Sequence, residues 1–300
     1  MLQSFRFRAT APLLLACFIS PYFASAEPVV IGSVHREAAA EIKRFLPLAN
    51  YVGKHLQSEG VNGARIVVAK DISQMGMLLR EGKVDVYIDS PFPSVAASVL
   101  SGSKFLLRRW KKGLAEYRSV IFEKKDSNLH RLEDLKGHIL AFEEPFSSSG
   151  YFIPKMALAD KGLKLVPKPD PTTAVNREEI GYVFSLHDEN TIVWVLRGKV
   201  TAGATDDYKY QRQTRRYPNS LKVIHTTSSF PRHLVSYRAD LAPKLVTRIK
   251  EIMIEMDQSP EGRSALREFE ETTKFDELPG PSMAQLLTLR KFVEAEVRPR

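Results

Sequence analysis

The chain has 300 residues, of which 43% are hydrophobic and 26% charged, so it can form one large or two modest globular domains. This composition excludes an extensively disordered or a collagen-like chain. The formal charge of +9 could attract anionic solutes, membranes or nucleic acid, but outside RRWKK (108–112) and RQTRR (212–216) it is scattered. We interpret both clusters as solvated faces and, without a recognisable nucleic-acid-binding module, expect no nucleic-acid partner.

Residues 1–26 have the order of regions typical of a secretory signal peptide. A pair of arginines precedes the apolar run APLLLACFI (11–19), and ASA (24–26) offers a small-x-small cleavage site. The apolar run is short for a membrane anchor, which favours a removed signal. LLAC also resembles a lipoprotein box with Cys17 as the acylated residue, and this second interpretation stays open. Both predict an exported, periplasmic protein.

Cys17 is the only cysteine in the chain, so cleavage after Ala26 would leave a mature protein without thiols. Disulfides, thiol catalysis and cysteine-ligated metals are then excluded. The sequence contains no HExxH motif or equivalent ligand spacing, so we do not expect a catalytic zinc site. We predict that the protein uses no cofactor and no metal.

Strand-like and helix-like patterns alternate along the chain after residue 26. The first group consists of a strand (28–34), a helix (38–60), a strand (64–70), a helix (72–82) and a strand (83–89). The second group consists of a strand (135–142), a helix (149–161), a strand (163–168), a helix (187–198) and a strand (199–206). This alternation predicts βαβ units and an α/β fold whose sheets are mostly parallel.

Two extended stretches connect the groups: 117–126 enters the second group and 221–238 leaves it. The part from residue 241 on is mostly helical in pattern. If this part packs on the first group, the chain crosses twice between two lobes, through a double-strand hinge. We therefore predict a first lobe of 27–116 and 239–300, a second lobe of 117–238 that includes the hinge strands, and a ligand cleft between them.

The run Ser147, Ser148 and Ser149 stands where the helix of the second group is expected to begin. In open α/β sheets, ligands bind beyond the carboxyl ends of the strands. The start of a helix exposes unpaired N–H groups with partial positive charge, and Gly150 would let a ligand approach the backbone closely. This combination suits a tetrahedral oxyanion. The alternative is an ordinary serine N-cap.

Other predicted strand ends bring further polar groups to the same region. His187 could donate to an anion, or it could cap a helix or lie in the core. Asp206 could face the cleft or cap the helix that follows it. In the first lobe, Asp89 and Ser90 occupy the equivalent position after a strand, so we include them as candidate ligand-binding residues.

Two segments resemble motifs of the periplasmic binding proteins for phosphonate, phosphite and phosphate. AFEEPFSSSGYFIP (141–154) is similar to their DP-x-S-T-S-G-Y-x-x-P signature, and VFSLHDENTIVWVLRGKVTAGATDD (183–207) to their F-x-G-S-H-D-x-x-x-x-A-V-x-x-G-x-V-D-A-G-A-V-D stretch. The resemblance implies a type II periplasmic binding fold that closes on its ligand and delivers it to an ABC importer. It also implies that the three serines, Tyr151 and His187 bind the oxyanion. Asp206 would meet the part of the ligand beyond the phosphorus, such as an amine, or accept a hydrogen bond from a protonated oxyanion.

The chain departs from the family pattern at several positions. Family members usually carry Gly-Pro and an aromatic residue after the first-lobe strand, where this chain reads DSPFPSVAAS (89–98). Glu144 replaces the Asp of the first signature, and Leu186 replaces the Ser before the histidine. The first-lobe contacts that tune specificity therefore differ. We expect Glu143 and Glu144 to lie on the solvent side of the turn.

Three functional interpretations follow. The one we favour is an exported, monomeric solute-binding protein, not an enzyme, that captures a small phosphonate-, phosphite- or phosphate-like oxyanion for an ABC transporter permease. The second is a sensor that presents its ligand to a membrane histidine kinase or a chemoreceptor. The third is an enzyme with Ser148 as nucleophile and His187 as base, but there is no G-x-S-x-G elbow and no assigned orienting acid.

Overall fold

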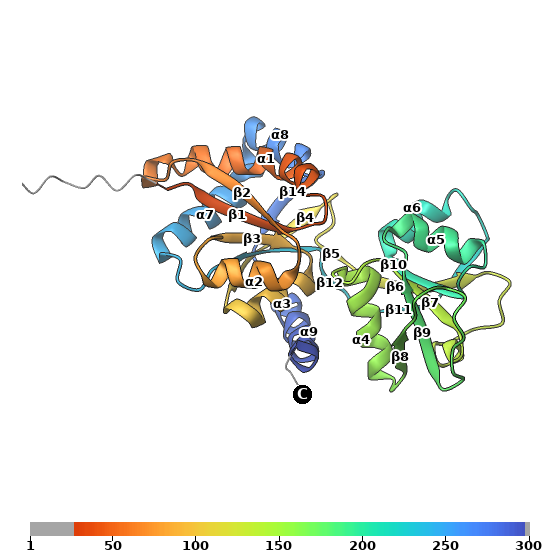
Figure 1. Ribbon diagram of the computed structural model, residues 1–300. Coiled ribbons are helices and arrows are strands. Elements are labelled where there is room, and N and C mark those ends of the chain that lie inside the picture. Colours follow the sequence, from red (N-terminus) through yellow and green to blue (C-terminus); the bar gives the residue numbers. More distant parts are fainter. Residues whose placement is uncertain (1–26, 298–300) are drawn as a thin grey trace, which may run out of the picture.

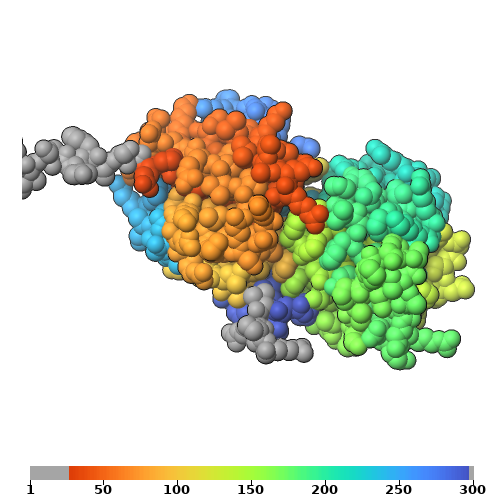
Figure 2. All heavy atoms as spheres, in the orientation of Figure 1, coloured from red at the N-terminus to blue at the C-terminus, as the bar shows by residue number. Residues whose placement is uncertain are grey.

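The computed structural model describes residues 27–297, which form two lobes, each built around its own six-stranded sheet (Figure 1). In the space-filling view the first lobe, red to yellow and blue, lies against the second, green to cyan (Figure 2). The predicted signal peptide and Cys17 lie outside the described residues. Within residues 27–297, no helix is both long and apolar enough to cross a membrane.

The first lobe has a mixed sheet with the strand order β14-β4-β13-β3-β1-β2. Its strands are β1 (Val29–Val34), β2 (Ala64–Ala69), β3 (Val86–Asp89), β4 (Lys104–Lys111), β13 (His233–Tyr237) and β14 (Thr272–Asp276). Its helices are α1 (Ala38–His55), α2 (Ile72–Arg80), α3 (Pro91–Ser101), α7 (Pro243–Glu255), α8 (Pro260–Glu268) and α9 (Gly280–Val297). All six residues of β1 are buried, because helices cover both faces of the sheet (Figure 1).

The second lobe has the strand order β11-β6-β10-β7-β9-β8. Its strands are β6 (Ser119–Lys124), β7 (Ile139–Phe142), β8 (Lys164–Pro167), β9 (Glu179–Phe184), β10 (Ala202–Asp206) and β11 (Leu221–Thr226). Its helices are α4 (Ile153–Asp160), which follows a π-helical turn (Ser148–Phe152), α5 (Asp188–Leu196) and α6 (Asp207–Thr214). Helix α4 packs on one face of the sheet and α5 on the other. Short 3-10 turns lie at Gln57–Glu59, Leu132–Leu135 and Met256–Gln258.

Parallel pairing is limited to part of each sheet. In the first lobe β1 pairs in parallel with β2 and β3, whereas β13 and β14 pair antiparallel with their neighbours. In the second lobe β10, β7, β9 and β8 pair in parallel, whereas β6 pairs antiparallel with both of its neighbours, β10 and β11. The antiparallel strands are those next to the crossings between the lobes, together with β14.

The two crossings between the lobes form a short antiparallel pair, β5 (Glu116–Tyr117) and β12 (Phe230–Pro231). The predicted second-lobe range of 117–238 ends too late, because β13 pairs with β3 and β4 of the first sheet. The extended pattern of 221–238 contains strands of both lobes. Such a pattern identifies strands but not the sheet that each one joins.

An apolar contact beside the hinge joins the lobes. The rings of Phe92 in α3 and Phe152 in the π-helical turn stack with 3.6 Å between their centroids, and Phe292 of α9 packs edge-on against Phe152 at 5.3 Å. Lys155 and Glu296 form an ion pair of 2.6 Å across the same boundary. These contacts place the start of α3 directly opposite the serine run.

Candidate ligand-binding site between the lobes

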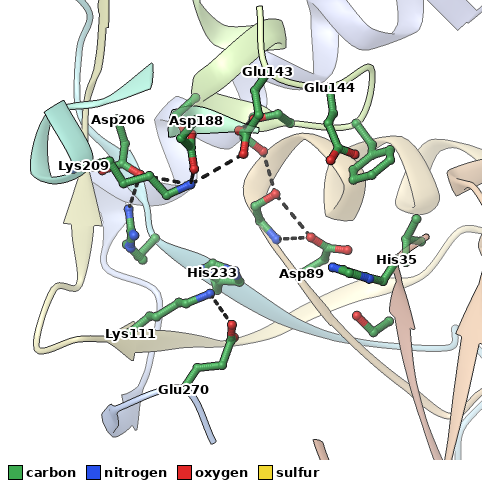
Figure 3. Close-up of a pocket in the computed structure, with 18 of the residues that line it drawn as sticks. His35, Asp89, Lys111, Glu143, Glu144, Asp188, Asp206, Lys209, His233 and Glu270 are labelled. Atoms are coloured by element: carbon green, nitrogen blue, oxygen red, sulfur yellow. Dashed lines mark hydrogen bonds and ion pairs between the residues drawn. The ribbon is translucent and has the colours of Figure 1, made fainter. Parts of the chain in front are cut away.

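A cavity of about 640 Å³ lies between the lobes beside the hinge. The first lobe contributes the ends of β1, β3 and β4, and the second contributes the serine run and the starts of α5 and α6. The hinge region contributes Tyr117, Arg232 and His233. Figure 3 shows labelled acidic and basic side chains of both lobes around this cavity, with Lys209 next to Asp188 and Lys111 next to Glu270.

Four helical segments begin at the wall of this cavity. Their N-cap residues are Ser90 for α3, Ser147 for the π-helical turn that leads into α4, His187 for α5 and Asp206 for α6. The first N–H groups of a helix lack partners within the helix and carry partial positive charge. At α3, Pro91 and Pro93 have no N–H and the Phe92 amide is bonded to Ser148, and at α6 the Lys209 amide is bonded to Asp206. The amides left for an anion are therefore those at the starts of the π-helical turn and of α5, both in the second lobe.

Much of the hydrogen-bonding capacity of the serine run is used within the protein. The Ser148 hydroxyl accepts from the Phe92 amide at 2.9 Å and donates to the Ser90 hydroxyl at 2.8 Å, so it links the two lobes. The Ser147 hydroxyl donates to Glu143 at 2.6 Å and accepts from the Gly150 amide at 3.0 Å. Ser147 is thus an N-cap, as the alternative interpretation proposed, and all three serines also line the cavity.

Gly150 has a different role from the one expected. A Cβ atom at this position would lie 2.5 Å from the Cβ of Glu143 and 2.8 Å from the Ser147 hydroxyl. The glycine therefore permits close packing of the turn on Glu143 rather than the approach of a ligand. The backbone bond from the Glu143 amide to the Gly150 carbonyl, 2.9 Å, closes this turn.

The prediction that Glu143 and Glu144 lie on the solvent side of the turn is wrong, because both line the cavity. The closed turn directs them inward, and their side chains are only 18% and 16% exposed. Glu144 pairs with Arg36 of the first lobe at 3.5 Å. Burial raises the pKa of Glu143 to about 7, although Lys209 opposes this shift.

Lys209 lies among three carboxylates of the second lobe (Figure 3). Its Nζ is ion-paired with Asp188 and lies 3.6 Å from Glu143 and 4.0 Å from Asp206. Burial alone would lower the pKa of Lys209, but the three acids outweigh it and raise that pKa. Asp206 also caps α6 by accepting from the Lys209 amide at 2.7 Å and pairs with Arg232 at 3.3 Å. This acidic group is therefore already neutralised from within.

The interpretation of RRWKK (108–112) as a solvated face is wrong. Arg109 is 1% exposed, and Lys111 lines the cavity. Both residues lie on β4, which is an inner strand of the sheet between β14 and β13. Both form ion pairs with Glu270, Arg109 at 3.1 Å and Lys111 at 2.8 Å. In the other cluster, 212–216, the arginines are exposed as predicted, but Arg212 also lines the cavity.

Seven of the eight predicted ligand-binding residues line the cavity: Ser147, Ser148, Ser149, His187, Asp206, Asp89 and Ser90. Tyr151 does not line it; its ring packs edge-on against Phe142 and Phe184, each at 5.0 Å between centroids. Burial raises the pKa of Asp89 to about 6, against the lowering effect of its bonds from Ser90 and Tyr87.

The prediction missed many charged or titratable residues of the cavity, among them Lys111, Lys209, Arg232 and His233. The RRWKK cluster was a signal for the first of these. The others stand in no motif that marks a binding residue. Among residues 27–297, no group of three or more histidine, cysteine, aspartate or glutamate side chains could hold a metal ion.

Two α/β lobes, a double-strand hinge and a polar cavity between the lobes define a type II periplasmic binding protein. A family model described as "ABC transporter, phosphonate, periplasmic substrate-binding protein" matches residues 31–279. The chain belongs to this family, as the two motifs predicted. The family consists of binding proteins of ABC transporters rather than enzymes, and its location is the periplasm.

Solved structures share this fold. The structure of XAC2383 from Xanthomonas citri bound to chloride ion superposes on this chain with a TM-score of 0.83 and a sequence identity of 25%. The match covers 89% of this chain and 97% of XAC2383. The same protein bound to ATP gives 24% identity and a TM-score of 0.84, over 91% and 100% of the chains. PhnD1 from Prochlorococcus marinus (MIT 9301) in complex with methylphosphonate gives 16% identity and a TM-score of 0.65, over 89% and 98%.

Proposed function

We propose that this protein captures a small phosphorus oxyanion, of the phosphonate, phosphite or phosphate type, in the inter-lobe cavity and delivers it to an ABC importer. The observation that carries the proposal is that two helix starts of the second lobe, the π-helical turn and α5, open onto the cavity, with Ser90 of the first lobe on its other side. Unpaired N–H groups at helix starts bind tetrahedral anions without a metal.

Within this site, Ser149 and His187 are the residues best placed to contact the anion directly. Ser149 is the second residue of the π-helical turn after its N-cap, Ser147. At this position the backbone amide has no hydrogen-bond partner within the helix. His187 caps α5, but its side chain makes no capping bond, so the imidazole is available to a ligand. Ser90 would complete the site from the first lobe.

The ligands named for related structures agree with an anionic ligand. XAC2383 is described as bound to chloride ion and to ATP, and PhnD1 as bound to methylphosphonate. All of these ligands are anions, although they differ greatly in size. We extend only this shared property to the present chain.

Calorimetric titration of the purified protein with methylphosphonate, phosphite, phosphate and sulfate tests the proposal. We expect at least one phosphorus oxyanion to bind. His187→Ala should weaken its binding, whereas His130→Ala should not, because His130 is exposed and does not line the cavity. If the folded protein binds none of these anions, or if the two variants behave alike, the proposal is wrong.

A further inference from the structure

The floor of the cavity beside the hinge is positively charged. We call Lys111, Arg232 and His233 the hinge floor: the first ends β4, and the other two lie at the junction of β12 and β13. Arg109, fully buried, lies on the same strand as Lys111. The hinge floor thus belongs to the first lobe and the hinge, whereas three of the four helical N-caps belong to the second lobe.

Carboxylates only partly neutralise this region. Glu270 is shared between Arg109 and Lys111, at 3.1 Å and 2.8 Å. Asp206 lies 3.3 Å from Arg232, but Lys209 also lies near it, at 4.0 Å. Lys209 is itself paired with Asp188, so at the floor two carboxylates, Glu270 and Asp206, face three cations, Arg109, Lys111 and Arg232.

Two nitrogen atoms of the hinge floor have no partner. Within residues 27–297, Arg232 Nε and His233 Nδ1 are buried without a hydrogen-bond partner, and Arg232 is 5% exposed. Buried polar groups are normally paired, and leaving a charged donor unpaired is costly. Burial and the nearby Lys111 and Arg109 also hold the pKa of His233 well below its usual value. An anion at the floor would supply the missing acceptor for Arg232.

The cavity is also larger than one oxyanion requires. Its volume of about 640 Å³ falls in the range of about 300–1,000 Å³ that is typical of sites for drug-sized ligands. A single phosphonate at the helix starts would leave the hinge floor unpaired. A longer ligand could reach both regions at once.

We propose that the hinge floor binds a second anionic group of the ligand, so that the ligand class is a phosphorus oxyanion linked to another anionic group, with oligophosphates as the simplest members. This inference rests on the proposed function, because the first anionic group is taken to bind at the helix starts. Lys111 and Arg232 are then specificity-determining residues.

Titration of the full chain with methylphosphonate, pyrophosphate, tripolyphosphate, ATP and phosphonoacetate tests the inference. We expect at least one of the four two-group ligands to bind about tenfold or more tightly than methylphosphonate, because one charge-assisted contact is worth about that factor. Pyrophosphate and tripolyphosphate test free oligophosphates, ATP tests a nucleotide, and phosphonoacetate tests a carboxylate as second group.

Lys111→Met tests the residue assignment. The variant should lower the affinity for the two-group ligand about tenfold and that for methylphosphonate by a clearly smaller factor. Lys274→Met is the matched control: it removes the same charge from the neighbouring strand β14, and Lys274 packs on Trp110 rather than lining the cavity. Thermal melting of both variants shows whether each is folded; if Lys111→Met is not, Lys111→Gln replaces it.

The outcomes separate the two proposals. Binding of methylphosphonate with no gain for any two-group ligand overturns the inference and leaves the proposed function intact. An equal loss for both ligand types in Lys111→Met, or the same loss in Lys274→Met, also overturns it. If no anion binds the folded protein, both proposals are wrong.

Discussion

The second-lobe wall and the hinge floor both carry dense charge, but they use it in different ways. On the second-lobe wall, Glu143, Asp188 and Asp206 surround Lys209, so each carboxylate has a cationic neighbour. At the hinge floor, Arg232 Nε and His233 Nδ1 have no partner among the described residues. We call the wall a closed network, because its carboxylates and Lys209 are paired with one another and stabilise the site. We call the floor an open network, because its unpaired nitrogen atoms would need a ligand as their partner.

This difference bears on what the ligand can carry. A substrate ammonium group would need a free carboxylate, and Lys209 already occupies the acidic group of the second lobe. An anionic group would find one unpaired cationic donor, Arg232 Nε, at the floor. At the hinge floor, an anionic group is therefore favoured over a cationic one, whereas Asp89 on the first lobe is a carboxylate without an ion-pair partner among the described residues.

The largest effect should come from opening the closed network. Lys209→Met would leave Glu143, Asp188 and Asp206 without their shared cation, and removing one partner of a buried ion pair typically costs about 3–5 kcal/mol. Urea unfolding measures this loss. Lys164→Met is the control: its pair with Glu179 is exposed, and such pairs contribute about 0–1 kcal/mol. Equal losses in the two variants would contradict a closed network around Lys209.

A smaller effect concerns the pH dependence of stability. Burial raises the pKa of Glu143 to about 7, above its value in the unfolded chain, so the folded state holds this proton more tightly. The contribution to stability is therefore fully present below about pH 4.5 and is lost as the pH rises through about 7. Integrated over that window, the shift corresponds to about 3 kcal/mol.

The variant Glu143→Gln isolates this contribution. The glutamine amide does not titrate, so the stability of the variant relative to the unmodified protein should increase between about pH 5 and pH 8, by about 2–3 kcal/mol. Urea unfolding at the two pH values measures the change. Glu178→Gln, at an exposed position, should show no such increase. A constant difference between Glu143→Gln and the unmodified protein would contradict the assignment.

The parts of the site that could be predicted from the sequence depend on local rules. Strand ends followed by helix starts bring Ser147, His187 and Asp206 to one region, because ligands in open α/β sheets bind beyond the strand ends. The two family motifs lie in the same segments. The fold followed from the same alternation of strands and helices, together with the two extended crossings.

The parts that could not be predicted depend on tertiary pairing. Glu143 faces the cavity only because its turn closes onto Gly150, and sequence alone suggested a solvent-facing acid. Arg232 and His233 reach the site because β13 inserts between β3 and β4 of the first sheet. Neither the alternation of the residues nor their charge shows which sheet a strand will join.

The smallest of the expected effects concerns the contact between the two lobes. Ser148 bonds to the Phe92 amide, at the second position of α3, and to Ser90, so it acts as a cap supplied by the opposite lobe. Ser148→Ala should cost about 1–2 kcal/mol, as loss of an N-cap does. Ser228→Ala is the control, because Ser228 is exposed and its hydroxyl bonds to Gln285 alone among the described residues, at 3.3 Å.

Ligand titration of the same variant shows which of the two networks Ser148 belongs to. If the Ser148 hydroxyl serves only to join the two lobes, its loss should reduce stability in urea unfolding more than it reduces anion affinity, because both of its bonds are already made within the protein. A large loss of affinity with unchanged stability would instead place Ser148 among the open, ligand-binding donors, together with Arg232.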